Sequence, residues 1–257
     1  MKQQEDRELS LSSLIGDNMA INVIMFDLDG TLLPMDQDEF VRSYFGHLAG
    51  KIAPRGYEPK ALIGAVWQGT EAMIKNAGEE NNETVFWKHF AEILGEDARK
   101  EFGVFEEFYN NEFDAVQQSC GFNAQSAETV KTLKEMGMRL VLATNPIFPS
   151  IATEKRVKWA GLDICDFEHY TTYENSNHCK PNLEYYMDIL EIIGAKPEEC
   201  LMVGNDVGDD MVAEKLGIKV FLLTDCLINK NNADISVYPH GSFCELIEYI
   251  NEFNMKK

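Results

Sequence analysis

The chain is short of positive charge. Its 257 residues contain 23 lysines and arginines against 43 aspartates and glutamates, a formal net charge of -20 with a pI near 4.6. Because a phosphate backbone is bound chiefly by lysine and arginine, this balance argues against nucleic acid and against anionic membrane surfaces as partners. If the substrate is an anion, the field of the whole molecule opposes its approach, and local positive potential must prevail in the binding cleft.

The sequence also lacks paired cysteines and long apolar runs. The six cysteines, at positions 120, 165, 179, 200, 226 and 244, form no Cys-x-x-Cys pair, which indicates free thiols in a reducing compartment and predicts a cytoplasmic protein. No apolar run approaches the roughly 18 to 20 residues that span a bilayer. Residues 1–18 are polar and have no signal-peptide core, so we expect a disordered or non-native leader, with Met19 as an alternative start.

What the chain does contain is enough apolar sequence for a large core, since 45% of its residues are hydrophobic and 11% aromatic. Between residues 36 and 122 the apolar side chains recur at helical spacing and predict four amphipathic helices. Breaks are expected near residues 54–56, 78–82 and 95, where proline or glycine occurs. Aromatic residues at this spacing more often belong to a core than to a ligand site.

Helices and strands alternate from residue 123 onward. Together with the apolar run at 21–26, buried strands are expected at 139–143, 167–171, 200–203 and 218–223, with a small strand at 235–238. Helices are expected at 127–136, 151–159, 181–193 and 211–216, and from Ser242, as N-cap, to about 253. This order predicts an α/β fold with a doubly wound parallel sheet, in which residues 36–122 are a helical insertion after the first strand.

Polar residues follow three of the predicted strands. Asp27 and Asp29 follow the first, and the turn at Gly30 allows one carboxylate and one backbone carbonyl to converge. Alone, this pair would be explained equally well by a polar turn. The other strands are followed by Thr144 and Asn145 and by Asn205, Asp206 and Asp210, which parallel strands bring to the same edge, and Lys180 supplies a positive charge. Converging carboxylates of this kind suit a hard cation such as Mg²⁺.

These residues together resemble the four motifs of the haloacid dehalogenase superfamily of hydrolases. Asp27-Leu28-Asp29-Gly30-Thr31 resembles the first motif, Thr144-Asn145 the second, Lys180-Pro181 the third, and Gly204-Asn205-Asp206 through Asp210 the fourth. The four occur in order with fitting spacing, and the resemblance covers nearly everything from Ile21 to the C-terminus. It implies a Rossmann-like core formed by residues 19–35 and 123–257, with residues 36–122 as a small helical cap domain.

The resemblance also implies a role for each residue. Asp27 would attack phosphorus and form an aspartyl-phosphate, and Asp29 would act as general acid and base. Thr144 and Asn145 would bind the phosphoryl oxygens, and Lys180 would offset the repulsion between nucleophile and substrate. Mg²⁺ would be held by the Asp27 carboxylate, the Asp29 backbone carbonyl and a residue of the fourth motif.

The fourth motif departs from the commonest family pattern, which places an aspartate directly after the glycine. Here Asn205 occupies that position and Asp206 follows. Either Asp206 ligates the metal with Asp210 in support, which we favour, or Asn205 contributes its amide oxygen. Asp209 is expected to be a solvated neighbour.

These observations predict Mg²⁺-dependent hydrolysis of a small phosphorylated metabolite. The alternatives are phosphotransferase, phosphonatase or dehalogenase chemistry on the same scaffold, of which Asp29 disfavours dehalogenation, or a phosphometabolite-binding protein without turnover. Substrate specificity is expected to lie in the loops at 54–59 or 78–82. Neither the substrate nor the oligomeric state is indicated by the sequence.

Overall fold

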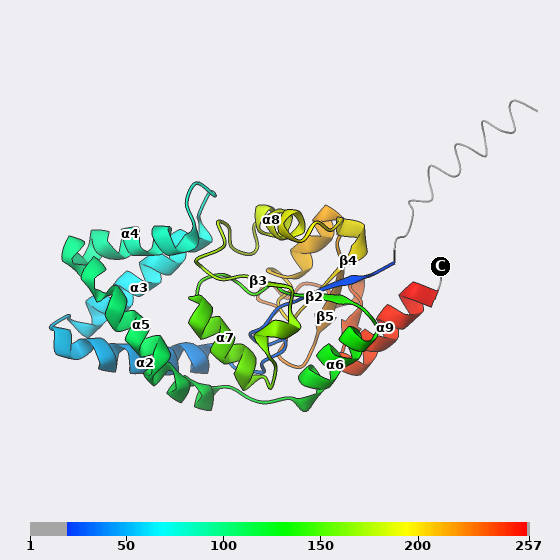
Figure 1. Cartoon of the computed structure of the whole chain (residues 1–257), viewed down its shortest axis with the longest axis horizontal. Coiled ribbons are helices and arrows are strands. Elements are labelled where there is room, and N and C mark those ends of the chain that lie inside the picture. Colours follow the sequence, from blue (N-terminus) through cyan, green and yellow to red (C-terminus); the bar gives the residue numbers. More distant parts are fainter. Residues whose placement is uncertain (1–19, 256–257) are drawn as a thin grey trace, which may run out of the picture.

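The computed structural model describes residues 20–255, apart from the side chains of Glu96 and Arg99, and is built around a six-stranded parallel sheet (Figure 1). The predicted leader, residues 1–18, and Met19 lie outside the described residues. The strand order is β3-β2-β1-β4-β5-β6. The strands are β1 (Val23–Phe26), β2 (Arg139–Leu142), β3 (His169–Tyr170), β4 (Cys200–Gly204), β5 (Lys219–Leu223) and β6 (His240–Gly241). The predicted doubly wound parallel sheet is confirmed.

Helices cover both faces of the sheet because the central strands are apolar on both sides. On one face, Ile24 and Phe26 of β1 belong to a cluster with side chains of α6 (Ala124–Glu135), α7 (Ser150–Trp159) and α9 (Phe243–Met255). On the other face, Val23 and Met25 pack with α8 (Leu183–Ile193) and η6 (Met211–Leu216). Alternate residues of a strand point to opposite faces, so one short strand serves both clusters.

The segment between β1 and β2 is helical, as predicted. It contains α2 (Gln37–Ile52), α3 (Pro59–Ile74), α4 (Asn82–Leu94) and α5 (Phe102–Asn110), with the short 3-10 helices η1 (Ala53–Arg55), η2 (Glu96–Glu101) and η3 (Glu112–Ser119). The side chains of Asp36, Glu58 and Asn81 accept hydrogen bonds from backbone N–H groups in the first turns of α2, α3 and α4. The breaks expected near residues 54–56, 78–82 and 95 coincide with the ends of these helices. Along residues 20–255, no helix is both long and apolar enough to cross a bilayer.

One local prediction near the C-terminal part of the sheet was wrong and another was confirmed. The strand expected at 235–238 is the 3-10 helix η7 (Ile235–Val237), and the sixth strand is instead β6, which pairs with β5. The helix expected at 211–216 has the predicted bounds; it is a 3-10 helix and ends at Gly217 in the left-handed conformation. Short apolar segments do not distinguish these alternatives by periodicity alone.

Candidate active site

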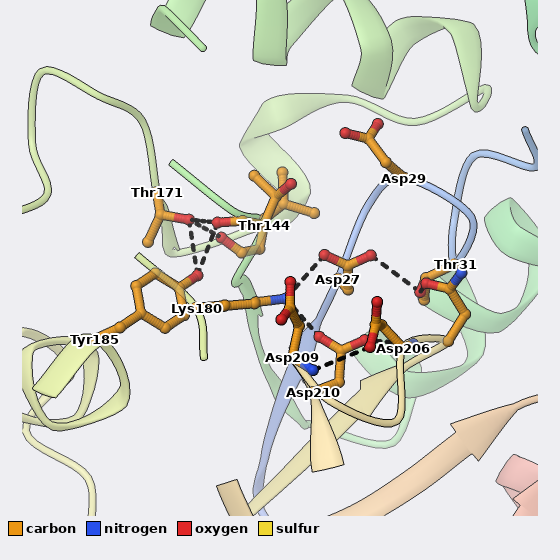
Figure 2. A network of polar contacts seen from close by, with 12 residues as sticks. Asp27, Asp29, Thr31, Thr144, Thr171, Lys180, Tyr185, Asp206, Asp209 and Asp210 are labelled. Atoms are coloured by element: carbon orange, nitrogen blue, oxygen red, sulfur yellow. Dashed lines mark hydrogen bonds and ion pairs between the residues drawn. The ribbon is translucent and has the colours of Figure 1, made fainter. Parts of the chain in front are cut away.

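The carboxyl ends of β1, β2 and β4 bring the predicted site residues together. Asp27 follows β1, Thr144 lies just beyond β2 and Asn205 follows β4, while β1 pairs with both other strands. The chain runs outward from β1 to β2 and β3 and then returns to β4 on the other side of β1. In sheets of this type, ligands bind at the point where the strand order reverses. Figure 2 shows the resulting cluster of side chains.

Lys180 lies at the centre of this cluster, between two aspartates. Its Nζ donates to Asp27 Oδ1 at 2.9 Å and to Asp210 Oδ1 at 2.6 Å, and its side chain is 1% exposed (Figure 2). Burial opposes the ammonium form, but the Asp210 and Asp27 carboxylates outweigh it and raise the pKa of Lys180 well above its usual value. Burial raises the pKa of Asp27, against the opposing effect of Lys180, and raises the pKa of Asp210 to about 6. The lysine therefore remains a buried cation.

The position of Lys180 differs from the prediction in one detail. Pro181 was expected in the first turn of the following helix, but α8 begins at Leu183 and Asn182 is its N-cap. The Asn182 side chain accepts a hydrogen bond from the Glu184 backbone N–H at 3.2 Å. Lys180 therefore lies in the loop before α8, and the cap residue, rather than the proline, begins the helix.

The loop after β1 is joined to the loop after β4 through Thr31. Its hydroxyl lies 3.2 Å from Asp27 Oδ2 and 3.0 Å from Asn205 Oδ1, and all three residues are buried. Gly30 has a φ of +86°, and a Cβ there would lie 2.3 Å from Asn205 Nδ2. Only glycine satisfies both constraints. No role was predicted for Thr31, although its place in the first motif was the available signal.

The two candidates in the fourth motif have different surroundings. The Asn205 amide is occupied, because its Nδ2 donates to the Cys226 carbonyl at 2.7 Å and its oxygen faces Thr31. Asp206 is half-buried, and its Oδ1 accepts from the backbone N–H groups of Gly208, at 2.7 Å, and Asp209, at 3.1 Å. Its Oδ2 lies 3.9 Å from Nζ of Lys230, a largely exposed lysine.

Asp209 and Asp210 complete this loop. Asp210 Oδ2 accepts a hydrogen bond from the Asp206 backbone N–H at 2.9 Å, and a Cβ on Gly204 would lie only 2.1 Å from that oxygen. Asp209, which was expected to be solvated, is half-buried and lines the cavity over this cluster. Burial raises its pKa to about 6, and the neighbouring Asp206 carboxylate contributes to this increase. Sequence alone does not show that the loop turns this side chain inward.

Asp29 is paired with an arginine that was not predicted from the sequence. Arg156 of α7 is completely buried, and its Nη1 donates to Asp29 Oδ2. The guanidinium also lies 4.5 Å from the centroid of the Phe148 ring and donates to the Ala152 carbonyl. In Figure 2 the Asp29 carboxylate points away from that of Asp27, and its Oδ1 is buried without a hydrogen-bond partner. Asp29 thus retains an unused acceptor atom beside the cluster.

Hydrogen bonds to a backbone carbonyl fix the position of the loop after β2. The Thr144 carbonyl accepts hydrogen bonds from the hydroxyls of Thr171, at 2.6 Å, and Tyr185, at 2.8 Å (Figure 2). The next residue, Asn145, has a buried Oδ1 without a hydrogen-bond partner. Both Thr144 and Asn145 line the cavity, so polar atoms of this loop are available to a ligand.

The donor atoms suit a hard divalent cation. Asp27 and Asp206 place carboxylates on the cavity, and the Asp29 backbone is on the same loop as Asp27. Within residues 20–255, no three His, Cys, Asp or Glu side chains are arranged as a complete metal site. Mg²⁺ characteristically takes one or two carboxylates and completes its octahedron with waters and substrate phosphate, so a partial set of oxygen donors fits this ion.

A cavity of about 550 Å³ opens over the cluster. Its floor is formed by the strand-end residues, and its walls come from α2, α3, α4 and α5 together with the loop after β2. The specificity loops expected at 54–59 and 78–82 do not line it; faces of the helices do instead. Part of the aromatic pattern assigned to a core therefore faces the cavity. This volume is sufficient for a small organic molecule.

The chain resembles known proteins in both sequence and structure. A family model described as haloacid dehalogenase-like hydrolase matches residues 21–225. Proteins named pyrophosphatase PpaX are 27% identical in Bacillus cereus strain AH820 and 28% identical in Halalkalibacterium halodurans, in each case over 201 residues that cover 78% of this chain and 82% of the relative.

Solved structures share the fold at lower sequence identity. A predicted phosphoglycolate phosphatase from Haemophilus somnus is 19% identical with a TM-score of 0.57, over 89% of this chain and 97% of its own. The L-2-haloacid dehalogenase RSc1362 is 18% identical with a TM-score of 0.56, over 91% and 100%. At this identity the likeness concerns the arrangement of sheet and helices only.

Proposed function

The chain belongs to the haloacid dehalogenase-like hydrolase family, and we propose that it hydrolyses phosphate monoesters of small molecules through an aspartyl-phosphate on Asp27. The observation that carries this proposal is the environment of Asp27: its Oδ1 is bound by a buried lysine and its Oδ2 faces Thr31, at the floor of a cavity. Both contacts orient a carboxylate for attack on a ligand above it.

The proposed reaction has two steps. A carboxylate oxygen of Asp27 forms a bond to phosphorus as the bond from phosphorus to the ester oxygen breaks. For this step Asp29 must be protonated and turned from Arg156 toward the ester oxygen, where it donates its proton to the departing alkoxide. Asp29, now ionised, then removes a proton from a water molecule, whose oxygen attacks phosphorus and releases phosphate from Asp27. Both residues return to their starting states, and the net reaction consumes one water.

Other residues bind and orient the phosphoryl group. Lys180 offsets the repulsion between the Asp27 carboxylate and an anionic substrate, because its ammonium stays charged between Asp27 and Asp210. Thr144 and Asn145 supply polar atoms at the same edge. Mg²⁺, held by the Asp27 and Asp206 carboxylates and the Asp29 carbonyl, with Asp210 positioning the Asp206 loop, would neutralise charge on the transferring group. Asn205 is better suited to hold Thr31 than to ligate the ion.

The helical segment 36–122 acts in this proposal as a cap over the core formed by residues 19–35 and 123–257. Its helices supply most of the cavity wall, so a bound substrate would be enclosed between them and the sheet edge. Closure of this kind excludes bulk water while the acyl-phosphate forms. Free thiols at all six cysteines agree with the reducing cytoplasm that we propose as the site of action.

The proposal is tested with Asp27→Asn. Phosphate release from phenyl phosphate in the presence of Mg²⁺ should be abolished, while thermal unfolding stays cooperative. The control is Asp38→Asn, which changes an exposed carboxylate on α2 and should leave turnover unaltered. Intact-mass spectrometry of acid-quenched wild-type enzyme should detect a phosphorylated species that Asp27→Asn lacks. Full activity of Asp27→Asn would refute the nucleophile.

A further inference from the structure

The walls of the cavity are more apolar than its floor. Phe45, Trp67 and Ile74 come from α2 and α3, and Phe86, Trp87 and Phe102 come from α4 and α5. The rings form pairs: the centroids of Phe45 and Trp67 are 5.3 Å apart, and those of Trp87 and Phe102 are 5.4 Å apart. The cavity is thus bounded on two sides by aromatic surface.

Part of this apolar surface remains accessible to solvent. The side chains of Trp67, Ile74 and Phe102 are 49%, 43% and 37% exposed, although each contributes to the cavity wall. Large apolar side chains gathered around a concave site are characteristic of ligand pockets, because an apolar ligand removes their surface from water. The accessible rings therefore favour a leaving group that is itself apolar.

The charges in these walls have one sign. Among the lining residues that the structure describes between 36 and 122, the charged side chains are Glu83 and Glu106, and no lysine or arginine is present. Glu174, from the loop after β3, adds a third carboxylate and accepts hydrogen bonds from the Ser150 backbone N–H and hydroxyl. The cavity lysines, Lys180 and Lys230, both lie beside aspartates on the sheet side.

Glu83 is one of the three carboxylates in the cavity walls. It lies in the first turn of α4, is half-buried, and borders the cavity beside Tyr173 and Glu174. Burial, and then the neighbouring Glu174 carboxylate, raise the pKa of Glu83, so both effects disfavour additional negative charge beside it. A cation would be stabilised there by Coulomb attraction and by the adjoining aromatic rings.

We propose that the preferred substrate is the phosphate monoester of an apolar, aromatic alcohol that has no second anionic group and that carries a cationic amino group. The proposal rests on the phosphatase function above and assigns its substrate class. Pyrophosphate and phosphoglycolate, the substrates in the names of similar proteins, each carry a second anionic group that would face Glu83, Glu106 and Glu174.

The experiment compares three aryl phosphates of one shape. Phenyl phosphate is neutral beyond its phosphate, 4-(aminomethyl)phenyl phosphate adds a cation, and 4-(carboxymethyl)phenyl phosphate adds an anion, with a methylene that limits electronic effects on the leaving group. We expect kcat/KM to be highest for the amino compound and at least about tenfold lower for the carboxylate, since like charges repel in a confined site. Pyrophosphate and phosphoglycolate should also be poorer substrates than phenyl phosphate.

Two variants locate the effect. Glu83→Gln should reduce the preference for the amino compound over the carboxylate, whereas Glu79→Gln, an exposed acid outside the cavity lining, should leave that preference unchanged. Equal kcat/KM for the three aryl phosphates, or a greater value for pyrophosphate than for any of them, would overturn the substrate class while leaving the phosphatase function in place. No Mg²⁺-dependent hydrolysis of any compound would overturn the function and the substrate class together.

Discussion

Replacing Lys180 by methionine tests the electrostatic core of the site without reference to any substrate. Methionine has a similar length and removes only the charge and the donor. The substitution leaves Asp27 and Asp210 without the cation that now contacts both, at 2.9 Å and 2.6 Å. The side chain of Asp210 is 1% exposed, so water cannot replace the lost partner there.

The magnitude follows from the geometry. With an effective dielectric constant of about 20, each contact corresponds to an attraction of about 6 kcal/mol, most of which is offset by the free-energy cost of burying the ammonium. Removing one partner of a buried ion pair typically costs about 3 to 5 kcal/mol. For a domain of this size that corresponds to a fall in Tm of roughly 6 to 20 °C. Lys230→Met is the matched control, since that lysine is 74% exposed and should contribute less than about 0.5 kcal/mol.

The destabilisation should depend on pH. Burial already raises the pKa of Asp210 to about 6, so the protonated form is favoured by folding and its contribution to stability is lost as pH rises through that value. Removing Lys180, which lowers the pKa of both aspartates, raises these values further. The difference in Tm between wild type and Lys180→Met should therefore be smaller at pH 5 than at pH 8.

A double-mutant cycle provides the decisive measurement. Adding Asp210→Asn to Lys180→Met removes one uncompensated carboxylate and should restore part of the lost stability, giving a coupling free energy above about 1 kcal/mol. Differential scanning fluorimetry and chemical denaturation at pH 5 and pH 8 report both quantities. A loss of stability that is equal at the two pH values, with additive single and double variants, would refute the ion-pair interpretation.

Three further predictions concern acid–base chemistry, backbone packing and pH dependence. Asp29→Asn should lower kcat by about 10² to 10⁴ and make the phosphoenzyme accumulate as a burst with 4-nitrophenyl phosphate, because water is no longer activated; unchanged steady-state turnover would contradict this. Gly204→Ala should destabilise the fold by about 1 to 3 kcal/mol in chemical denaturation, since its Cβ would meet Asp210 Oδ2 at 2.1 Å, and a change within about 0.5 kcal/mol would count against it. Burial lowers the pKa of His169 below 6.5, so its contribution to stability is present above that pH and lost as pH falls. His169→Gln should therefore raise Tm relative to wild type more at pH 5.5 than at pH 7.5, and an equal difference in Tm at the two pH values would exclude the effect.

The sequence predicted those parts of the fold that depend on local pattern. Buried strands such as β1 and β4 are unbroken apolar runs with polar residues after them, and α2, α3 and α4 begin at side chains suited to capping. Strand β6 could not be found this way. It consists of His240 and Gly241, and it is a strand only because β5 lies beside it with unpaired backbone groups.

The candidate site shows the same difference between residues that a local sequence pattern identifies and residues that only the folded structure brings into place. Asp27 and Lys180 belong to motifs that can be found in the sequence. They could be assigned to one edge of the sheet because the carboxyl ends of parallel strands lie at the same edge. Arg156 was not predicted, since it lies 127 residues beyond Asp29 in the middle of α7 and has no motif around it. The partial burial of Asp209 was not predicted, because it depends on how the loop after β4 turns, which packing against the rest of the molecule determines.

The charge of the site explains why an acidic chain would need a divalent cation to act on a phosphate ester. Two lysines among the described cavity residues, Lys180 and Lys230, are outnumbered by aspartates at the floor, namely Asp27, Asp29, Asp206, Asp209 and Asp210. Arg156 neutralises one of these and Lys180 already serves two others. The protein's own side chains thus leave the floor acidic, and the dianionic phosphoryl group would be repelled from it. Additional positive charge held by the remaining carboxylates would reverse that sign, so the arrangement of Asp27 and Asp206 supports the proposed use of Mg²⁺ together with membership of the family.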